Sequence, residues 1–154
     1  MGVSRNIRIR LLTNLNFFSD IITVLISEGY CFGEKNKIVT LSENDVDEFN
    51  YMEFDTFDIV KGVLDKREQK GYNNYIVIWD NETDESLLVS STKLENNYSD
   101  YKNHYDINFA IGYGVRIKDA ERYTDFSIYL NKLLPVLLKN SIYLCEINCS
   151  DYNC

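Results

Sequence analysis

The sequence is poor in the residues that separate or interrupt folded segments. Its 154 residues include one proline and seven glycines, and no Pro-, Gly- or Ser-rich stretch divides the chain. A flexible linker is therefore not expected. The length suits one ordinary domain, and 45% hydrophobic with 14% aromatic residues are enough to form a packed core. We predict a single domain over residues 1–154.

Long hydrophobic runs are also absent. No apolar stretch reaches the roughly 20 residues that a membrane-spanning helix needs. The segment from Met1 to Asn6 lacks the hydrophobic core of a signal peptide, and Arg8 and Arg10 interrupt the apolar positions that follow. From these absences we expect a cytoplasmic protein without a membrane anchor.

Residues suited to common catalytic chemistry are scarce. The one histidine, His104, lies in a tyrosine-rich polar segment without a neighbouring nucleophile motif, so we interpret it as a surface or partner-contacting residue. Gly112-Tyr113-Gly114 lacks the third glycine and the helix of a dinucleotide-binding loop. The usual hydrolase, phosphate-loop and zinc-protease motifs are missing as well. We therefore expect a non-catalytic protein without a cofactor.

A metal site is not expected either. The four cysteines have no C-x-x-C spacing and are interpreted as free thiols of a reducing compartment: Cys31, Cys145, Cys149 and Cys154. The acidic run that begins at Asp45 places Phe49 and Asn50 where a calcium loop needs an oxygen ligand and a glycine.

Hydrophobic periodicity predicts six strands and three helices. The strands, where apolar residues alternate or run together, are expected at residues 7–12, 37–41, 75–79, 86–92, 107–117 and 142–149. The helices, where apolar residues recur every three or four positions, are expected at residues 16–28, 56–70 and 124–140, the last kinked or split by Pro135. Segments 42–55 and 93–105 show neither period and are interpreted as loops with at most a short helix.

The order of these elements indicates an α+β fold. A two-layer sandwich, with a mixed or antiparallel sheet of about six strands and three helices, fits it best, and a ferredoxin-like arrangement is the nearest template. A doubly wound α/β sheet would need a helix between each pair of strands, whereas residues 80–85 predict a hairpin turn.

Basic residues are outnumbered in this chain. Sixteen lysines and arginines stand against 24 aspartates and glutamates, which gives a net charge of −8. Proteins that bind nucleic acid or anionic membranes depend on basic residues. We therefore expect neither nucleic acid nor a membrane as a direct partner, and favour a basic protein.

The acidic residues are concentrated in two segments. Seven lie between Ile38 and Val60 with no lysine or arginine among them, and four more lie in the turn at 80–85. The remaining 13 acids are outnumbered by the 16 basic residues. Aromatic residues accompany the first segment, as in interface cores whose surrounding charges steer association. We predict a partner-binding surface comprising Asp45, Asp47, Glu48, Phe49, Tyr51, Glu53, Phe54, Asp55, Asp58, Asp80, Glu82, Asp84 and Glu85.

A second interpretation of the first acidic segment is structural. Phe49, Tyr51 and Phe54 can anchor the segment to the core and leave the acids as a solvated rim, which is the usual state of a charge run. The two interpretations differ in whether these rings are buried or exposed.

In size, acidity and composition the chain resembles the immunity proteins of bacterial toxin systems, including those of contact-dependent growth inhibition. The resemblance covers the character of the whole chain, which is rich in Asn, Ile and Tyr, and the acidic stretch 43–58. It implies neutralisation of a cognate toxin domain, often a basic nuclease, whose active site an acidic inhibitor blocks in place of phosphates. No residue role is carried over from that family.

Two other functions are compatible with the sequence. One is a small-molecule or regulatory module of ferredoxin-like type, with a pocket formed by the small residues 110–114 or rimmed by Tyr98, Tyr101 or His104. The other is a hydrolase that uses two converging carboxylates. The oligomeric state stays open, since an exposed strand at either end of the sheet can pair with a copy of the chain or with a partner.

Overall fold

The computed structural model describes residues 3–33 and 37–153. Within these ranges the chain forms three helices, α1 (Phe18–Ser27), α2 (Phe57–Gln69) and α3 (Phe126–Lys139). It also forms ten strands: β1 (Val3–Thr13), β2 (Tyr30–Cys31), β3 (Ile38–Leu41), β4 (Tyr51–Phe54), β5 (Asn74–Asp80), β6 (Glu85–Leu94), β7 (Asn103–Ile111), β8 (Arg116–Ile117), β9 (Ala120–Thr124) and β10 (Tyr143–Asn153). The three predicted helices and the six predicted strands are all present, with shifted ends.

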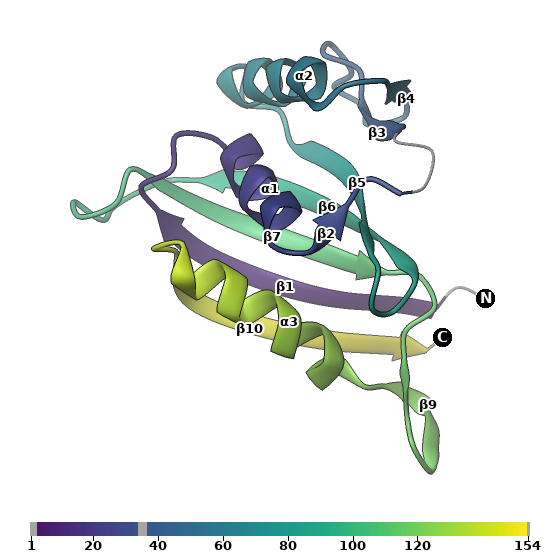
Figure 1. Cartoon of the computed structure of the whole chain (residues 1–154). Coiled ribbons are helices and arrows are strands. Elements are labelled where there is room, and N and C mark those ends of the chain that lie inside the picture. Colours follow the sequence, from purple (N-terminus) through teal and green to yellow (C-terminus); the bar gives the residue numbers. More distant parts are fainter. Residues whose placement is uncertain (1–2, 34–36, 154) are drawn as a thin grey trace.

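Seven strands form an antiparallel sheet in the order β10-β1-β7-β6-β5-β3-β4, and β2 pairs with β5 as an eighth strand. β8 and β9 form a separate hairpin that projects from the sheet (Figure 1). The α+β class with three helices is confirmed, but the expectation of about six strands is wrong. The missed strands β2, β4, β8 and β9 have two to five residues, too few to establish an alternating pattern.

The three helices cover one face of the sheet and share one hydrophobic core with it (Figure 1). Strand β1 shows how the sequence sets this face, because Ile7, Ile9 and Leu11 are buried whereas Arg8 between them is exposed. Successive side chains of a strand point to opposite faces, so the apolar set meets the helices. Helix α1 contributes a buried apolar stripe at helical spacing: Phe18, Ile21, Ile22 and Leu25.

The opposite face of the sheet, here called the open face, is not covered by any of the described helices (Figure 1). Toward β10 it is polar, because the strand register places Arg8 between Asn108 of β7 and Asn148 of β10. Toward β4 it is apolar, and Val77 of β5 lies opposite Leu88 of β6. The open face therefore has a polar half and an apolar half.

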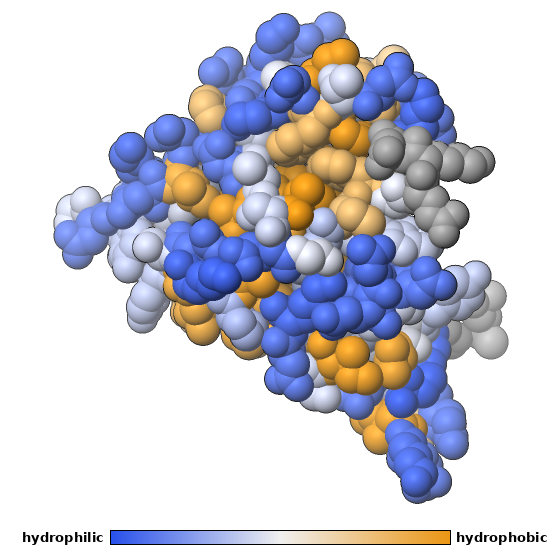
Figure 2. Space-filling view, in the orientation of Figure 1, coloured by the Kyte–Doolittle hydropathy of each residue, from blue (hydrophilic) through white to orange (hydrophobic). Residues whose placement is uncertain are grey.

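The outer surface of the helix layer is hydrophilic in part, with apolar patches along α3 and a larger apolar area between α1 and α2, beside β2 (Figure 2). Ile128 and Leu138 are among the exposed apolar residues of α3. None of the helices that the structure describes combines the length and the apolar character needed to span a membrane.

Two expected elements differ from the structure. Helix α3 continues through Pro135 without being split. Pro135 and Asn131, one turn earlier, are both exposed, so the carbonyl that loses its donor faces water. The strand expected at 107–117 ends at Ile111, because Gly114 adopts a φ of +76° that turns the chain toward the β8–β9 hairpin.

Candidate binding surface

The acidic loop that precedes β4 is tied to the interior by two buried groups. Asp45 is 6% exposed, and its carboxylate accepts hydrogen bonds from the N–H groups of Glu48 at 3.0 Å and Asn50 at 2.6 Å. Arg67 of α2 is 0% exposed and donates to the carbonyl oxygens of Ser42 and Asp45, both at 2.7 Å. Because these bonds satisfy the backbone groups of the loop, the loop follows one fixed path beside α2.

The loop brings apolar side chains into solvent where it enters β4. Phe49 is 82% exposed and Tyr51 is 48% exposed, and Val46 and Met52 are exposed as well. Large apolar side chains grouped in water are uncommon on monomeric proteins and are typical of interaction sites. Of the three rings expected to anchor the segment, only Phe54 packs against the core, whereas Phe49 and Tyr51 are exposed.

Strand β4 is the last strand of the sheet, and no described strand pairs with its outer edge. The Ser42 N–H donates to the Asn50 carbonyl oxygen at 3.1 Å, in register with the β3–β4 ladder. Hydrogen-bonded and non-bonded pairs alternate along an antiparallel ladder. The N–H and C=O of Glu53 and the C=O of Tyr51 therefore point to the free edge, while the Tyr51 N–H donates to the Phe49 carbonyl at 3.3 Å.

A groove on the apolar half of the open face begins at the same edge. Its volume is about 470 Å³, and it is lined by Phe32, Gly33, Lys37, Val39, Glu53, Val77, Trp79, Asp84 and Ser86. Val39, Val77 and Trp79 belong to the adjacent strands β3 and β5 and supply apolar surface. Glu53 comes from the first acidic segment and Asp84 from the 80–85 turn, so this groove brings together the two acidic segments of the sequence.

The groove has an excess of negative charge. Of the described residues that line it, Lys37 is the one basic residue, and it is paired with Asp55. The hydrogen bond to Asp55 and the charge of that carboxylate raise the pKa of Lys37, so the ammonium group stays charged and neutralises Asp55. Among residues 3–33 and 37–153, Glu53 and Asp84 form no ion pair.

Two of the predicted surface acids are buried at the ends of the 80–85 turn. Asp80 accepts a hydrogen bond from Lys132 Nζ of α3 at 2.7 Å. Glu85 accepts hydrogen bonds from the Gly114 N–H at 3.1 Å and from the Tyr129 hydroxyl. These contacts hold the turn against α3 and the end of β7, which is a structural role and not a surface one.

The exposed part of the predicted surface is smaller than expected. Asp45 belongs with the buried acids, and Glu48 is half-buried, with its Oε2 accepting a hydrogen bond from the Tyr75 hydroxyl at 2.8 Å. Burial, together with the Glu48 hydrogen bond and charge, raises the pKa of Tyr75 to about 12. The exposed members, here called the acidic edge, are Asp47, Phe49, Tyr51, Glu53, Asp55, Asp58, Glu82 and Asp84.

The apolar floor of the groove was missed by the sequence-based interpretation. The continuous apolar run from Tyr75 to Trp79 is typical of a central strand, and β5 is indeed internal to the sheet. Its alternate residues Val77 and Trp79 are only half-buried, because none of the helices in the described part of the chain covers the open face. A continuous apolar run looks the same in both situations, so the sequence carries no signal that separates them.

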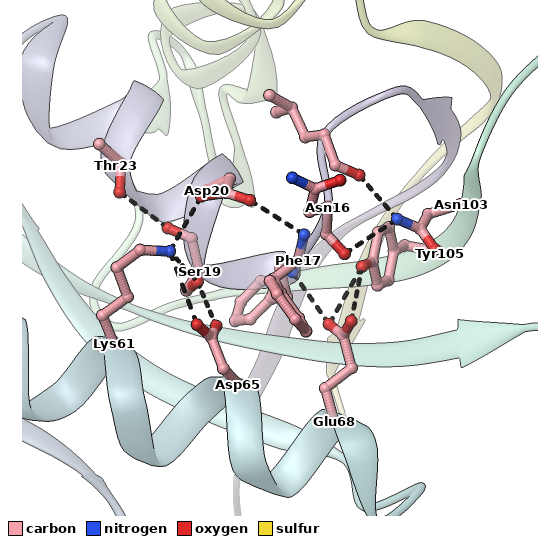
Figure 3. Close-up of polar contacts among 12 residues, drawn as sticks. Asn16, Phe17, Ser19, Asp20, Thr23, Lys61, Asp65, Glu68, Asn103 and Tyr105 are labelled. Atoms are coloured by element: carbon pink, nitrogen blue, oxygen red, sulfur yellow. Dashed lines mark hydrogen bonds and ion pairs between the residues drawn. The ribbon is translucent and has the colours of Figure 1, made fainter.

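A separate polar cluster lies between α1, α2 and β7 (Figure 3). Glu68 accepts a hydrogen bond from the Phe18 N–H at 2.9 Å and contacts from the Tyr105 hydroxyl at 3.0 Å to each carboxylate oxygen. Its carboxylate thus satisfies a backbone donor in the first turn of α1. Burial raises the pKa of Glu68 above its ordinary value, although these hydrogen bonds and the charge of Lys93 act in the opposite direction.

Ser19 and Lys61 in the same cluster have the composition of a serine–lysine catalytic pair, with Lys61 Nζ 2.8 Å from Ser19 Oγ (Figure 3). Catalysis would need a neutral lysine to accept the hydroxyl proton. Burial lowers the pKa of Lys61, but the hydrogen bond to Asp20 and the charges of Asp65 and Asp20 raise it above its ordinary value. Ser19 is fully buried and donates to Asp65, so the cluster is a structural tie between helices.

Two carboxylates also meet on the polar half of the open face, as a hydrolase using acidic residues would require. Asp106 and Glu146 line a small depression of about 100 Å³ together with Arg8 and Arg10. Arg8 Nε lies 2.8 Å from both Asp106 oxygens, and Arg10 Nε lies 3.6 Å from Glu146 Oε2. Each carboxylate is thus occupied by an arginine, so the two are not free to act together on a substrate.

His104 is 8% exposed, so the expectation of a surface histidine is wrong. Strand β7 begins at Asn103, earlier than expected, and takes His104 into the sheet. The His104 Nδ1 lies 2.9 Å from the Glu95 carbonyl oxygen and Nε2 lies 3.3 Å from Arg10 Nη1. The Tyr98 and His104 rings meet in a T-shaped arrangement with 5.7 Å between centroids, so both ring nitrogens and the ring itself have protein contacts.

No group of three or more His, Cys, Asp or Glu side chains suited to a metal ion occurs in the part of the chain that the structure describes. Cys31, Cys145 and Cys149 are free thiols, and Cys154 lies outside the described residues.

No protein-family model, curated protein or solved structure matches the chain. The candidate surface is therefore defined by its geometry and charge.

Proposed function

We propose that this chain is a non-catalytic binding protein that captures a basic protein partner on the acidic edge. The observation that carries the proposal is the groove beside β4, where Glu53 and Asp84 line the same cavity as the indole of Trp79. A lysine or arginine side chain suits such a groove, because its stem packs on apolar surface while its charge meets carboxylates or an aromatic ring. Phe49 and Tyr51 add exposed aromatic area next to the charges.

The partner class that we propose is a bacterial toxin domain, which this chain would neutralise as an immunity protein. Toxin nucleases are basic where they hold phosphates, so an acidic protein surface can occupy that site. The concentration of acids in two segments, without a lysine or arginine in the first, supports this choice. A cytoplasmic location belongs to the same proposal, since an immunity protein must meet the toxin where the toxin acts.

Affinity capture from the native host tests this proposal, with the chain immobilised and bound protein eluted at high salt. The test variant reverses three exposed acids of the acidic edge to lysine: Asp47, Glu53 and Glu82. The buried Asp45 is left intact, because its loss would disturb the loop itself. The matched control reverses three exposed acids elsewhere, with the same change in net charge: Glu95, Asp100 and Glu121.

We expect the native chain and the control variant to capture the same basic protein and the test variant to lose it. That protein, expressed alone, should stop growth, and co-expression of the native chain should restore growth. Capture by the test variant equal to that by the control would contradict the proposed surface. A captured protein that has no effect on growth would contradict the immunity role.

We also propose a finer description of the fold, in which β1, α1, β6, β7, α3 and β10 form a ferredoxin-like unit with the segment from β2 to β5 inserted. Two observations support it: the chain order of these elements is β-α-β-β-α-β, and their strands are adjacent in the sheet as β10-β1-β7-β6.

A depression of about 360 Å³ at one end of this unit makes small-molecule binding a second candidate function. The depression is lined by Asn14, Asp100, Tyr101, Ser141, Ile142 and Tyr143.

A metabolite panel in a thermal-shift assay tests the second candidate. A ligand that raises the Tm of the native chain but not of Tyr101→Ala would favour it. If no compound of the panel changes the Tm and a basic protein is captured, the second candidate is rejected and the binding-protein proposal remains.

A further inference from the structure

We infer, on the basis of the function proposed above, that the basic partner adds a strand to the free edge of β4 and places a lysine or arginine in the groove formed by Glu53, Asp84 and Trp79. The inference names the form of the partner, an extended basic segment, and the place where it joins the sheet.

The free edge of β4 presents the backbone groups that strand addition needs. Glu53 directs both its N–H and its C=O outward, and Tyr51 directs its C=O outward, as the ladder alternation requires. Strand addition gains affinity from such main-chain hydrogen bonds and specificity from pockets for alternate side chains. Because β4 has four residues, few backbone bonds can form, and the side-chain pocket has to select the partner.

Side chains of an added strand would alternate between the two faces of the sheet. Those on the open face would lie beside Glu53 and reach toward the groove. Those on the helix-bearing face would lie beside Met52, which is exposed and lies opposite the buried Thr40 of β3. The matching partner segment therefore has basic residues at every second position and apolar residues between them.

The opposite edge of the sheet does not suit the same partner. β10 is also a terminal strand, and Tyr143 and Ile147 are exposed along it. However, its Glu146 is paired with Arg10, and Arg8 lines the same depression. Arg8 and Arg10 already neutralise both carboxylates of that depression, Asp106 and Glu146, so charge complementarity assigns a basic strand to β4.

A short capped peptide of alternating lysine and valine is the probe, with binding measured by titration calorimetry. Two further versions carry backbone N-methyl groups either on every lysine or on every valine, which removes alternate N–H groups and keeps the side chains. Only one of these sets of N–H groups can face β4 in an added strand. We therefore expect one methylated peptide to bind like the parent and the other roughly tenfold more weakly. Equal binding of both, or no binding of the parent peptide, overturns the inference.

Glu53→Pro and Glu53→Gln provide the matching test on the protein. Proline removes the outward N–H and is tolerated where a strand N–H faces away from the sheet, whereas glutamine removes only the charge. We expect E53Q to weaken binding of the parent peptide a few-fold and E53P roughly tenfold further. Circular dichroism checks that E53P folds, and the methylated peptides decide the question if it does not.

The two proposals fail in different ways. Equal loss of peptide affinity in E53P and E53Q means that the partner docks through side chains alone, which overturns strand addition and leaves the binding function intact. If the native chain and the control variant do not capture a basic protein that the test variant loses, the binding function is overturned, whatever the peptide experiments show.

Discussion

Arg67 and Asp45 meet inside the protein, where the Arg67 guanidinium donates to the Asp45 carbonyl oxygen at 2.7 Å. The Asp45 carboxylate is not the acceptor of this bond; it accepts the N–H groups of Glu48 and Asn50 instead. A basic and an acidic side chain thus both form hydrogen bonds with backbone groups of the same loop. The exposure of Phe49 at the end of that loop depends on this buried arrangement.

Arg67→Met is expected to lower the free energy of unfolding by about 3 kcal/mol or more, because it removes the donor to the buried carbonyl of Asp45 and to the partly buried carbonyls of Ser42 and Asn73. Urea denaturation followed by the fluorescence of Trp79 measures the change. Lys66→Met on the exposed side of the same helix is the control and should stay within about 0.5 kcal/mol of the native chain. Similar losses in the two variants would show that the loop does not depend on Arg67.

Asp45→Ala and Asp47→Ala should separate two acids that are neighbours in the sequence. Asp45→Ala removes the acceptor of two backbone hydrogen bonds and should cost about 2 kcal/mol of unfolding free energy. Asp47 is exposed, so Asp47→Ala should change stability by no more than about 0.5 kcal/mol. Equal costs in chemical denaturation would argue against a buried role for the Asp45 carboxylate.

Phe49→Ala should leave the unfolding free energy within about 0.5 kcal/mol of the native value, since the ring is 82% exposed. Phe54→Ala should be clearly destabilising, by roughly 2–3 kcal/mol, because that ring packs against the core. Thermal or urea unfolding of the two variants gives the comparison. A costly Phe49→Ala would mean that the ring anchors the loop and is not available to a partner.

Gly114→Ala and Gly62→Ala should have opposite effects. Gly114 has a φ of +76°, and an added Cβ would lie 2.6 Å from Arg5 Cδ, so the substitution should cost about 1–2 kcal/mol. Gly62 lies within α2 with open space around it, so alanine should stabilise the chain by roughly 0.5–1 kcal/mol. Differential scanning calorimetry would record a lower Tm for the first and a higher Tm for the second; a shift of the same sign in both would contradict this backbone geometry.

Glu68→Gln should change how stability depends on pH. Burial raises the pKa of Glu68 in the folded state, so folding favours the protonated carboxyl. The stabilising contribution is therefore fully present below the unfolded pKa and is lost as pH rises through the folded pKa. Compared with E68Q, the native chain should gain unfolding free energy as the pH is lowered from neutral toward 4.5, the ordinary pKa of a glutamate side chain. Urea curves across this range test it, and a difference that stays constant or shrinks on acidification would contradict the raised pKa.

The main elements could be predicted because their patterns are long. The alternation around Ile9 and the helical spacing around Ile22 extend over enough residues to fix both type and buried face. The turn at 80–85 was predicted from its polar residues between two apolar runs, and it joins β5 to β6. In contrast, β4 is a strand because β3 pairs with it, and its four residues carry no alternation of their own.

The sequence predicted the acidic segments of the candidate surface but not which of their acids are exposed. A count of charges does not show which acids are paired with residues elsewhere in the chain. Asp80 is neutralised by Lys132, and Glu85 is held by Tyr129, both distant in the sequence. Asp45 is buried by hydrogen bonds to its own loop, which the sequence shows only as one more acid. The groove at β4 depends on strand order, and no local pattern reveals that order.

The pairing of Val3 with Asn153 places the two ends of the described chain next to each other, on β1 and β10. These strands lie across the sheet from β4 (Figure 1). A tether or a fused reporter at either end would consequently join the sheet on the side opposite the acidic edge. Both ends can therefore carry labels in one molecule. Energy transfer between the labels would report separation of β1 from β10 without altering the acidic edge.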